Sequence, residues 1–257
     1  MKKNYQLGGI LASIAALIGI IGHFVLFKKW FIVGMNTPAA EPGCEILLNY
    51  IHPFMSDLGI LAGVLFAVSA IGFFTRRDWA FPVTVVALVL ALLASWFINV
   101  PYMAAGLPPA YFILFWPYVI LYFLFMIAVG KLSWSRTLVA LLTGIAYIFC
   151  WMNGVASTSR MITIGDPLFT QVQRLNWVAM LGFAVVTVGI ILKSKEWMRV
   201  LALVAVITEL VVGIPLALST ASALGRFSLF GLGPIACLIL LAFLLWPGVW
   251  ERWTEME

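Results

Sequence analysis

The chain has 257 residues, of which 64% are hydrophobic and only 10% charged, and its mean hydropathy is +1.10. Soluble domains carry about 25% charged residues, so most of this surface must face lipid, and the composition excludes a water-soluble domain. The formal net charge is +5, but the basic residues lie between apolar segments without forming a stripe. This distribution is typical of topology signals, so we expect membrane lipids and not nucleic acid as partners.

The first apolar segment, 7–27, follows the basic start MKKNYQ. It is longer than the apolar region of about 7–15 residues in a signal peptide, and no small-x-small cleavage site follows it. We therefore interpret it as a retained first span.

Further apolar stretches of near-spanning length follow along the chain. A bilayer core of about 30 Å needs roughly 20 helical residues. The sequence therefore predicts an all-α fold, a polytopic helical bundle of about eight transmembrane helices in a single integral membrane domain, 1–257, of the cell membrane. The predicted spans are 7–27, 58–74, 80–100, 110–130, 137–156, 175–192, 200–219 and 228–247.

The connections between these spans indicate the orientation of the bundle. Ten lysines and arginines lie on the side of the two termini and five on the opposite side. Because positive charge concentrates in cytoplasmic loops, we expect both termini in the cytoplasm.

Two outer connections, 28–57 and 157–174, are long, and each follows the first helix of a four-helix half. Each half later turns through a basic–acidic–tryptophan sequence, Arg77-Asp78-Trp79 or Lys195-Glu196-Trp197. This pattern is expected of a duplication into halves 1–130 and 131–257, as in some transporters. The alternative is that short basic loops resemble each other through topology alone.

Glu209 lies near the middle of the seventh predicted span. A carboxylate in hydrocarbon costs several kcal/mol, so its presence needs a reason. One interpretation is a proton, cation or substrate site. The other is a protonated side chain that bonds a neighbouring helix or a partner subunit.

The two histidines are His23, at the end of the first span, and His52, in the outer connection. A membrane haem normally takes its two ligands from facing helices, which these positions do not predict, so a haem carrier is kept as the alternative. We interpret His23 as an interfacial hydrogen-bonding residue. The three cysteines form no CxxC or Cys/His cluster. We therefore expect no metal and no cofactor.

Polar side chains collect near the predicted outer ends of the spans. Such a set around one mouth would form a substrate or ion site, although a polar rim facing water is the alternative. Together with Glu209, the candidate site residues are Glu41, Glu45, His52, Asp57, Asn99, Asn153, Arg160, Asp166 and Arg174.

Motifs of catalysis are missing from the sequence. It contains no GxSxG, HExxH, P-loop or DxxD pattern, so no catalytic residue is assigned.

The segment around Ser56-Asp57-Leu58-Gly59, preceded by Glu41-Pro42-Gly43, resembles the uncharacterised prokaryotic membrane family called domain of unknown function 998. The resemblance covers about 20 residues and implies a small helical bundle, without an activity. Physical chemistry predicts that Ser56 or Asp57 caps the second span, and that Gly59 lets another helix approach closely.

We therefore predict a multi-pass membrane protein that is either an accessory subunit of a membrane complex or a small transporter-like protein with an outward-facing polar cavity. The alternative is a membrane enzyme acting on a lipid or quinone, with the carboxylates Glu41, Glu45, Asp57 and Asp166 and an arginine that holds an anion.

Overall fold

The computed structural model describes residues 4–37, 47–165 and 167–255. Within these ranges the chain forms helices and turns and no strand. Seven described helices are long and apolar enough to cross a membrane, and the eighth predicted span corresponds to a shorter apolar helix, Leu229–Leu245. The protein is thus an all-α, multi-pass membrane protein. The cytoplasmic location of its termini stays a prediction.

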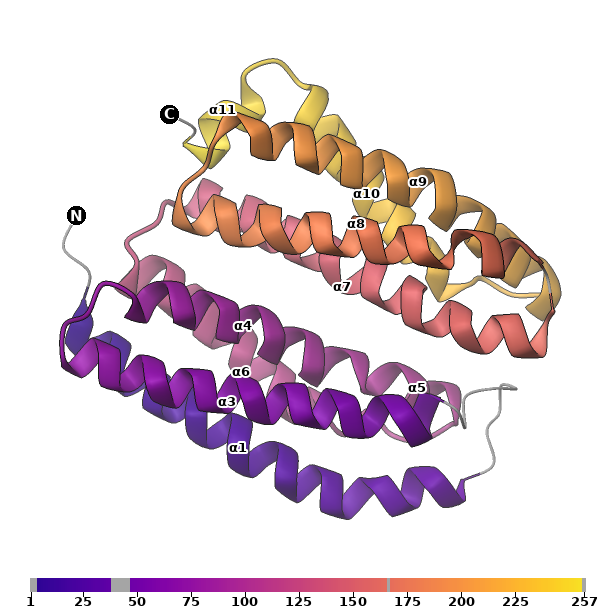
Figure 1. Ribbon diagram of the computed structural model, residues 1–257, viewed down its shortest axis with the longest axis horizontal. Helices are drawn as coiled ribbons and strands as arrows, with labels where there is room; N and C mark the ends of the chain where they lie inside the picture. Colours follow the sequence, from indigo (N-terminus) through magenta and orange to yellow (C-terminus); the bar gives the residue numbers. More distant parts are fainter. Residues whose placement is uncertain (1–3, 38–46, 166, 256–257) are drawn as a thin grey trace. The chain divides into compact units, whose positions relative to one another are not determined.

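The chain divides into two compact units, Met1–Ser133 and Trp134–Glu257. In the first unit α3 packs between α1 and α4, and α6 contacts both α1 and α4 (Figure 1). The helices of this unit are α1 (Tyr5–Asn36), the π-helix η1 (Leu47–Ile51), α3 (His52–Phe74), α4 (Ala80–Phe97), α5 (Asn99–Ala104), α6 (Phe112–Phe123) and the π-helix η2 (Leu124–Val129).

In the second unit α8 packs between α7 and α9, and α10 contacts both α9 and α7 (Figure 1). A short last helix, α11, packs against α7 and α10. The helices of this unit are α7 (Trp134–Thr163), α8 (Pro167–Leu192), α9 (Glu196–Leu224), the 3₁₀ turn η3 (Leu229–Gly231), α10 (Leu232–Leu245) and α11 (Val249–Thr254).

The two predicted outer connections are largely helical, which corrects their assignment as the long loops 28–57 and 157–174. Helix α1 continues to Asn36 and η1 begins at Leu47, while α7 reaches Thr163 and α8 begins at Pro167. At a rise of 1.5 Å per residue, the 32 residues of α1 are about 48 Å long, well beyond a bilayer core of about 30 Å. Hydropathy detects only the part of a helix that matches the core.

Helices α1 and α3 approach each other at a pair of glycines. A Cβ atom on Gly19 would lie 2.7 Å from the Cα of Gly63, and a Cβ on Gly63 would lie 2.8 Å from the backbone nitrogen of Ile20. Small residues at such crossings let helix backbones touch, which gives membrane helices their packing energy in the absence of a hydrophobic drive. The two glycines therefore set the distance between α1 and α3.

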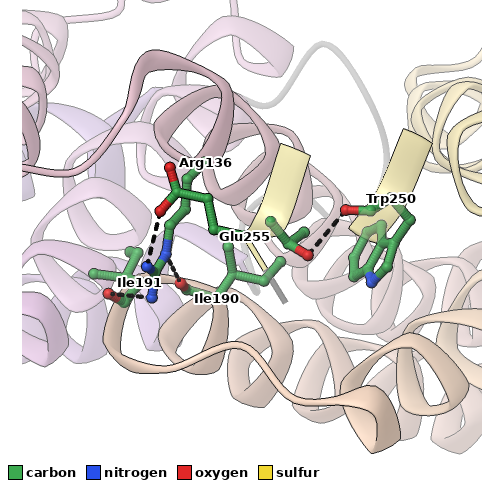
Figure 2. A network of polar contacts seen from close by, with 6 residues as sticks. Arg136, Ile190, Ile191, Trp250 and Glu255 are labelled. Atoms are coloured by element: carbon green, nitrogen blue, oxygen red, sulfur yellow. Dashed lines mark hydrogen bonds and ion pairs between the residues drawn. The ribbon is translucent and has the colours of Figure 1, made fainter. Parts of the chain in front are cut away.

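Arg136 of α7 caps the end of α8 (Figure 2). Its Nε donates to the carbonyl of Ile190 at 2.6 Å and its Nη2 to the carbonyl of Ile191 at 3.4 Å. Its Nη1 forms an ion pair of 3.4 Å with Glu255. The last carbonyls of a helix lack intrahelical partners and carry partial negative charge, so a guanidinium stabilises this end of α8.

Arg199 of α9 has the same role at the end of α10. Its Nη2 donates to the carbonyl of Leu244 at 2.8 Å, and its Nη1 pairs with Glu251 of α11. Within α11, Thr254 Oγ1 donates to the carbonyl of Trp250 at 2.9 Å (Figure 2). Arg136 and Arg199 therefore cap the ends of α8 and α10, and Arg199 also holds α11 through its pair with Glu251. From the sequence, basic residues between spans were expected only to set the topology.

Candidate functional site

Glu209 lies in α9 and is fully buried within the second unit. Its Oε1 accepts a hydrogen bond of 2.7 Å from the side-chain amide of Asn153 on α7. Its Oε2 has no hydrogen-bond partner among the described residues. A buried carboxyl oxygen without a described partner needs an explanation, because an unmade buried hydrogen bond costs about 1–3 kcal/mol.

Two glycines make the space that the Glu209 carboxyl occupies. A Cβ atom on Gly213, one turn further along α9, would lie 2.5 Å from Oε1. A Cβ on Gly233, in the first turn of α10, would overlap the same oxygen. The backbones of α9 and α10 therefore enclose one side of the carboxyl group, and Asn153 of α7 covers another.

Asn153 joins three elements of the second unit. Besides Glu209, its Nδ2 donates to the carbonyl of Phe230 at 3.2 Å. That carbonyl has no helical partner four residues on, because Pro234 lacks an N–H. The amide nitrogen of Asn153 thus satisfies a carbonyl that the proline leaves open, while its Oδ1 finds no partner in the described part of the chain.

A thiol completes the surroundings of Glu209. Cys150, one turn before Asn153 on α7, is fully buried and interacts with both the Glu209 carboxyl and the thiol of Cys237 on α10. The contacts described for Glu209 are therefore with an amide, a thiol and glycine backbone.

A second polar cluster lies in the first unit around His52, the first residue of α3. Tyr102 of α5 donates its hydroxyl hydrogen to the carbonyl of Trp30 at 2.8 Å, so its oxygen accepts from His52 Nδ1 at 3.0 Å. His52 Nε2 then accepts from the hydroxyl of Tyr111 at 2.7 Å. Each hydroxyl has one hydrogen, and that of Tyr102 goes to Trp30, so Nδ1 of His52 carries a proton. A neutral imidazole with its proton on Nδ1 can make both bonds.

Asn99, the first residue of α5, extends this cluster. Its Oδ1 accepts from the backbone N–H of Tyr111 at 2.9 Å, and its Nδ2 donates to the carbonyls of Ser95 and Trp96 at 2.8 and 3.1 Å. The hydrogen-bonding atoms of His52 and Asn99 are thus satisfied within the protein. The cluster joins α1, α3, α5 and the start of α6, and we expect it to act as a structural lock that holds these helices of the first unit together.

Removing the Tyr111 hydroxyl tests this lock. We expect Tyr111→Phe to lower the free energy of unfolding by about 1–3 kcal/mol, because His52 Nε2 would be left buried without a donor. Tyr118→Phe is the matched control on α6, since its hydroxyl makes a long hydrogen bond of 3.4 Å to the carbonyl of Ala15. Thermal or denaturant unfolding in detergent measures both variants, and equal losses would contradict the proposed lock.

His23 differs from the prediction that it is an interfacial hydrogen-bonding residue. It is fully buried, and neither ring nitrogen has a partner within the described ranges. Its ring lies against Gly59, where a Cβ atom would overlap it, and 5.7 Å from the Tyr111 ring. Tight packing against the glycine of α3 excludes water from the imidazole, which explains why it is not hydrated as an interfacial residue would be.

The predicted helix cap at Ser56 or Asp57 is wrong. Helix α3 begins at His52, so both residues lie within the helix, Ser56 buried and Asp57 exposed. Pro53 occupies the first turn, where its missing N–H costs nothing. The helix starts earlier than hydropathy suggests because that proline, and not Ser-Asp, suits the first turn.

Of the remaining candidate residues, some lie on described helices and the others lie outside the described residues. Arg160 is buried on α7 and Arg174 is exposed on α8. Glu41, Glu45 and Asp166 lie outside the described residues. Asp57 belongs to the first unit and Arg160 to the second, so the carboxylate–arginine set of the enzyme alternative stays a prediction.

The sequence predicts Glu209 and Asn153 as separate candidate residues and does not predict that they form a pair. Tyr111 and the glycines Gly213 and Gly233 are not predicted from the sequence. One signal was available: Cys150 and Asn153 are spaced three residues apart, and so lie on one face of α7.

No protein-family model, curated protein or solved structure matches the chain. The resemblance to domain of unknown function 998 stays a prediction. Within the described residues no three His, Cys, Asp or Glu side chains are grouped to hold a metal ion. The fold and this site define a multi-pass membrane protein with a buried carboxyl–amide pair.

Proposed function

We propose that this protein is a small transporter-like membrane protein in which Glu209 carries the coupling ion. The observation that supports this proposal is the buried carboxyl group of α9, which is bonded through one oxygen to Asn153 and has no partner for the other among the described residues. An ionisable side chain at the centre of a membrane helix costs about 2.5–3.5 kcal/mol on insertion scales, and such residues mark ion and substrate pathways.

The surroundings of Glu209 favour this role over a purely structural one. Its described contacts are with the Asn153 amide, the Cys150 thiol and the backbone of two glycines. These groups do not neutralise a carboxylate, so a proton or a monovalent cation has to accompany it. A group that must keep such an ion when buried, and can release it when exposed, has the property that coupled transport requires.

We also propose that the chain arose by duplication into two four-helix halves, which is common among transporters. The two units support this through the same packing order, in which the second helix lies between the first and third and the fourth contacts the first and third. In both, a glycine with positive φ follows the third span, Gly106 at +76° and Gly225 at +65°.

The polar residues of the two units are placed alike, which further supports the duplication. In the first unit, Asn99 of the third span bonds the backbone of Tyr111 just before the fourth helix. In the second unit, Glu209 of the third span lies against Gly233 in the first turn of the fourth. A polar contact between the third span and the start of the fourth helix is thus common to both units.

Replacing the carboxyl group tests the proposed function. The purified full chain is reconstituted in liposomes that contain a pH-sensitive or a sodium-sensitive dye, and a mixture of small cell metabolites is added outside. We expect solute-dependent proton or sodium movement with the wild type, and a loss of at least about tenfold with Glu209→Gln, which keeps the shape and the bond to Asn153 but cannot exchange the ion.

Glu196→Gln is the matched control, because Glu196 lies on the same helix but is exposed. It should retain the wild-type flux. Equal fluxes from Glu209→Gln and the wild type would refute the role of Glu209. Fixed co-purifying subunits together with an absence of any flux would favour an accessory subunit.

A further inference from the structure

We infer that Glu209 holds a proton in the resting protein, and that this proton lies between Glu209 Oε2 and the side-chain oxygen of Asn153. The two side chains already share one hydrogen bond of 2.7 Å, from Asn153 Nδ2 to Glu209 Oε1. Their two remaining polar atoms, Glu209 Oε2 and Asn153 Oδ1, are both buried without a partner in the described part of the chain. One proton on Oε2 would form a hydrogen bond to Asn153 Oδ1 and so give both atoms a partner.

The chemistry of the two groups explains why a single proton suffices. A carboxylic acid and a primary amide are both planar, and each carries two polar atoms on one carbon. When the amide N–H bonds one acid oxygen, the acid O–H can bond the amide oxygen and close a ring of two hydrogen bonds. Without the proton, Oε2 and Oδ1 are both acceptors that cannot bond each other, and each costs about 1–3 kcal/mol unsatisfied.

The orientation of the Asn153 amide follows from its second contact. The carbonyl of Phe230 only accepts hydrogen bonds, so the atom that faces it at 3.2 Å has to be the nitrogen. The nitrogen has two hydrogens, which go to Phe230 and to Glu209 Oε1. Asn153 Oδ1 is therefore left for the proton of Glu209, and a flipped amide would lose the bond to Phe230.

This inference deepens the proposed function, on which its role in transport rests. It identifies the coupling ion as a proton, and it makes Asn153 the positioning residue that retains it. Because Asn153 belongs to α7 and Glu209 to α9, the proton is released only when these two helices shift enough to open the pair.

Infrared difference spectroscopy of the full chain in lipid bilayers tests the proton directly. We expect the carbonyl band of a protonated carboxylic acid at neutral pH, present in the wild type and in Glu196→Gln and missing in Glu209→Gln. The band should not change when excess sodium chloride is added. An ionised carboxylate at Glu209, or an acid band that disappears on adding sodium, would overturn the inference.

Asn153→Leu tests the hydrogen-bonded ring. The acid band should move to higher frequency and exchange with deuterium faster, because its O–H loses its acceptor. If this variant does not fold, Asn153→Ser serves instead. An unchanged band in whichever variant folds would overturn the hydrogen-bonded ring between Glu209 and Asn153.

The two proposals can fail separately. If Glu209 is ionised and Glu209→Gln lacks flux, the proton on Glu209 is rejected and the role of Glu209 in transport is retained. If Glu209 is protonated and Glu209→Gln retains full flux, the role of Glu209 in transport is rejected and the proton is retained.

Discussion

Gly63→Ala is expected to lower the free energy of unfolding by about 3 kcal/mol, at the upper end of the range for overpacked sites. The new Cβ would lie 2.8 Å from the backbone nitrogen of Ile20 and 3.1 Å from the carbonyl carbon of Gly19. Backbone atoms cannot rotate away as side chains do, so α1 and α3 would have to separate. Denaturant or thermal unfolding of the purified protein in detergent measures the loss.

Gly144→Ala is the matched control for this experiment. Gly144 lies in α7, and among the described residues the only atom within 4 Å of its added Cβ is Thr187 Cγ2, at an ordinary 3.7 Å. Alanine is favoured over glycine in a helix by up to about 1 kcal/mol, so this variant should be as stable as the wild type or more stable. Equal stability of the Gly63→Ala and Gly144→Ala proteins would show that α1 and α3 do not touch at Gly63.

Gly59→Ala is expected to have a similarly large effect for a different reason. Its Cβ would overlap Nε2, Cε1 and Cδ2 of the His23 ring. His23 is fully buried, so its ring has no open space to move into, and we expect a loss of about 2–3 kcal/mol. Unfolding experiments on the single variant measure this cost.

The double variant Gly59→Ala/His23→Ala separates this clash from a general intolerance of alanine at position 59. Because His23→Ala removes the ring that the new Cβ would meet, we expect the double variant to be more stable than Gly59→Ala alone. The coupling between the two changes should be within the range of about 0.5–3 kcal/mol that is found for contacting residues. A double variant less stable than Gly59→Ala would contradict the predicted contact.

Hydropathy predicted the helical fold well because a membrane span must be apolar along its whole length. Seven of the predicted spans correspond to long apolar helices, and the eighth to the shorter Leu229–Leu245. The helix ends were predicted poorly, as at α1, which continues to Asn36, and at α3, which begins at His52. Beyond the bilayer core a helix no longer needs apolar residues, so composition stops marking its end.

The candidate site was predicted only in part. Glu209 was identified because a carboxylate in an apolar run is costly wherever the helix packs. Its pairing with Asn153 could not be predicted, since the two residues are 56 positions apart and their contact depends on how α7 and α9 pack. His52 and Asn99 were expected to face an outer mouth, whereas Tyr102 and Tyr111 hold them within the first unit.

By itself, the sequence determined that this protein lies in a membrane, that its spans are helices, and that Glu209 is a costly residue in the middle of one of them. These properties follow from the composition of each segment and from the solvent it must face. Only the tertiary structure decided which polar atoms have partners. It joined Glu209 to Asn153 and left one oxygen of each without a partner in the described ranges. Hydrogen bonds depend on distances between helices, and those distances are set by contacts such as Gly19 with Gly63 that no single segment encodes.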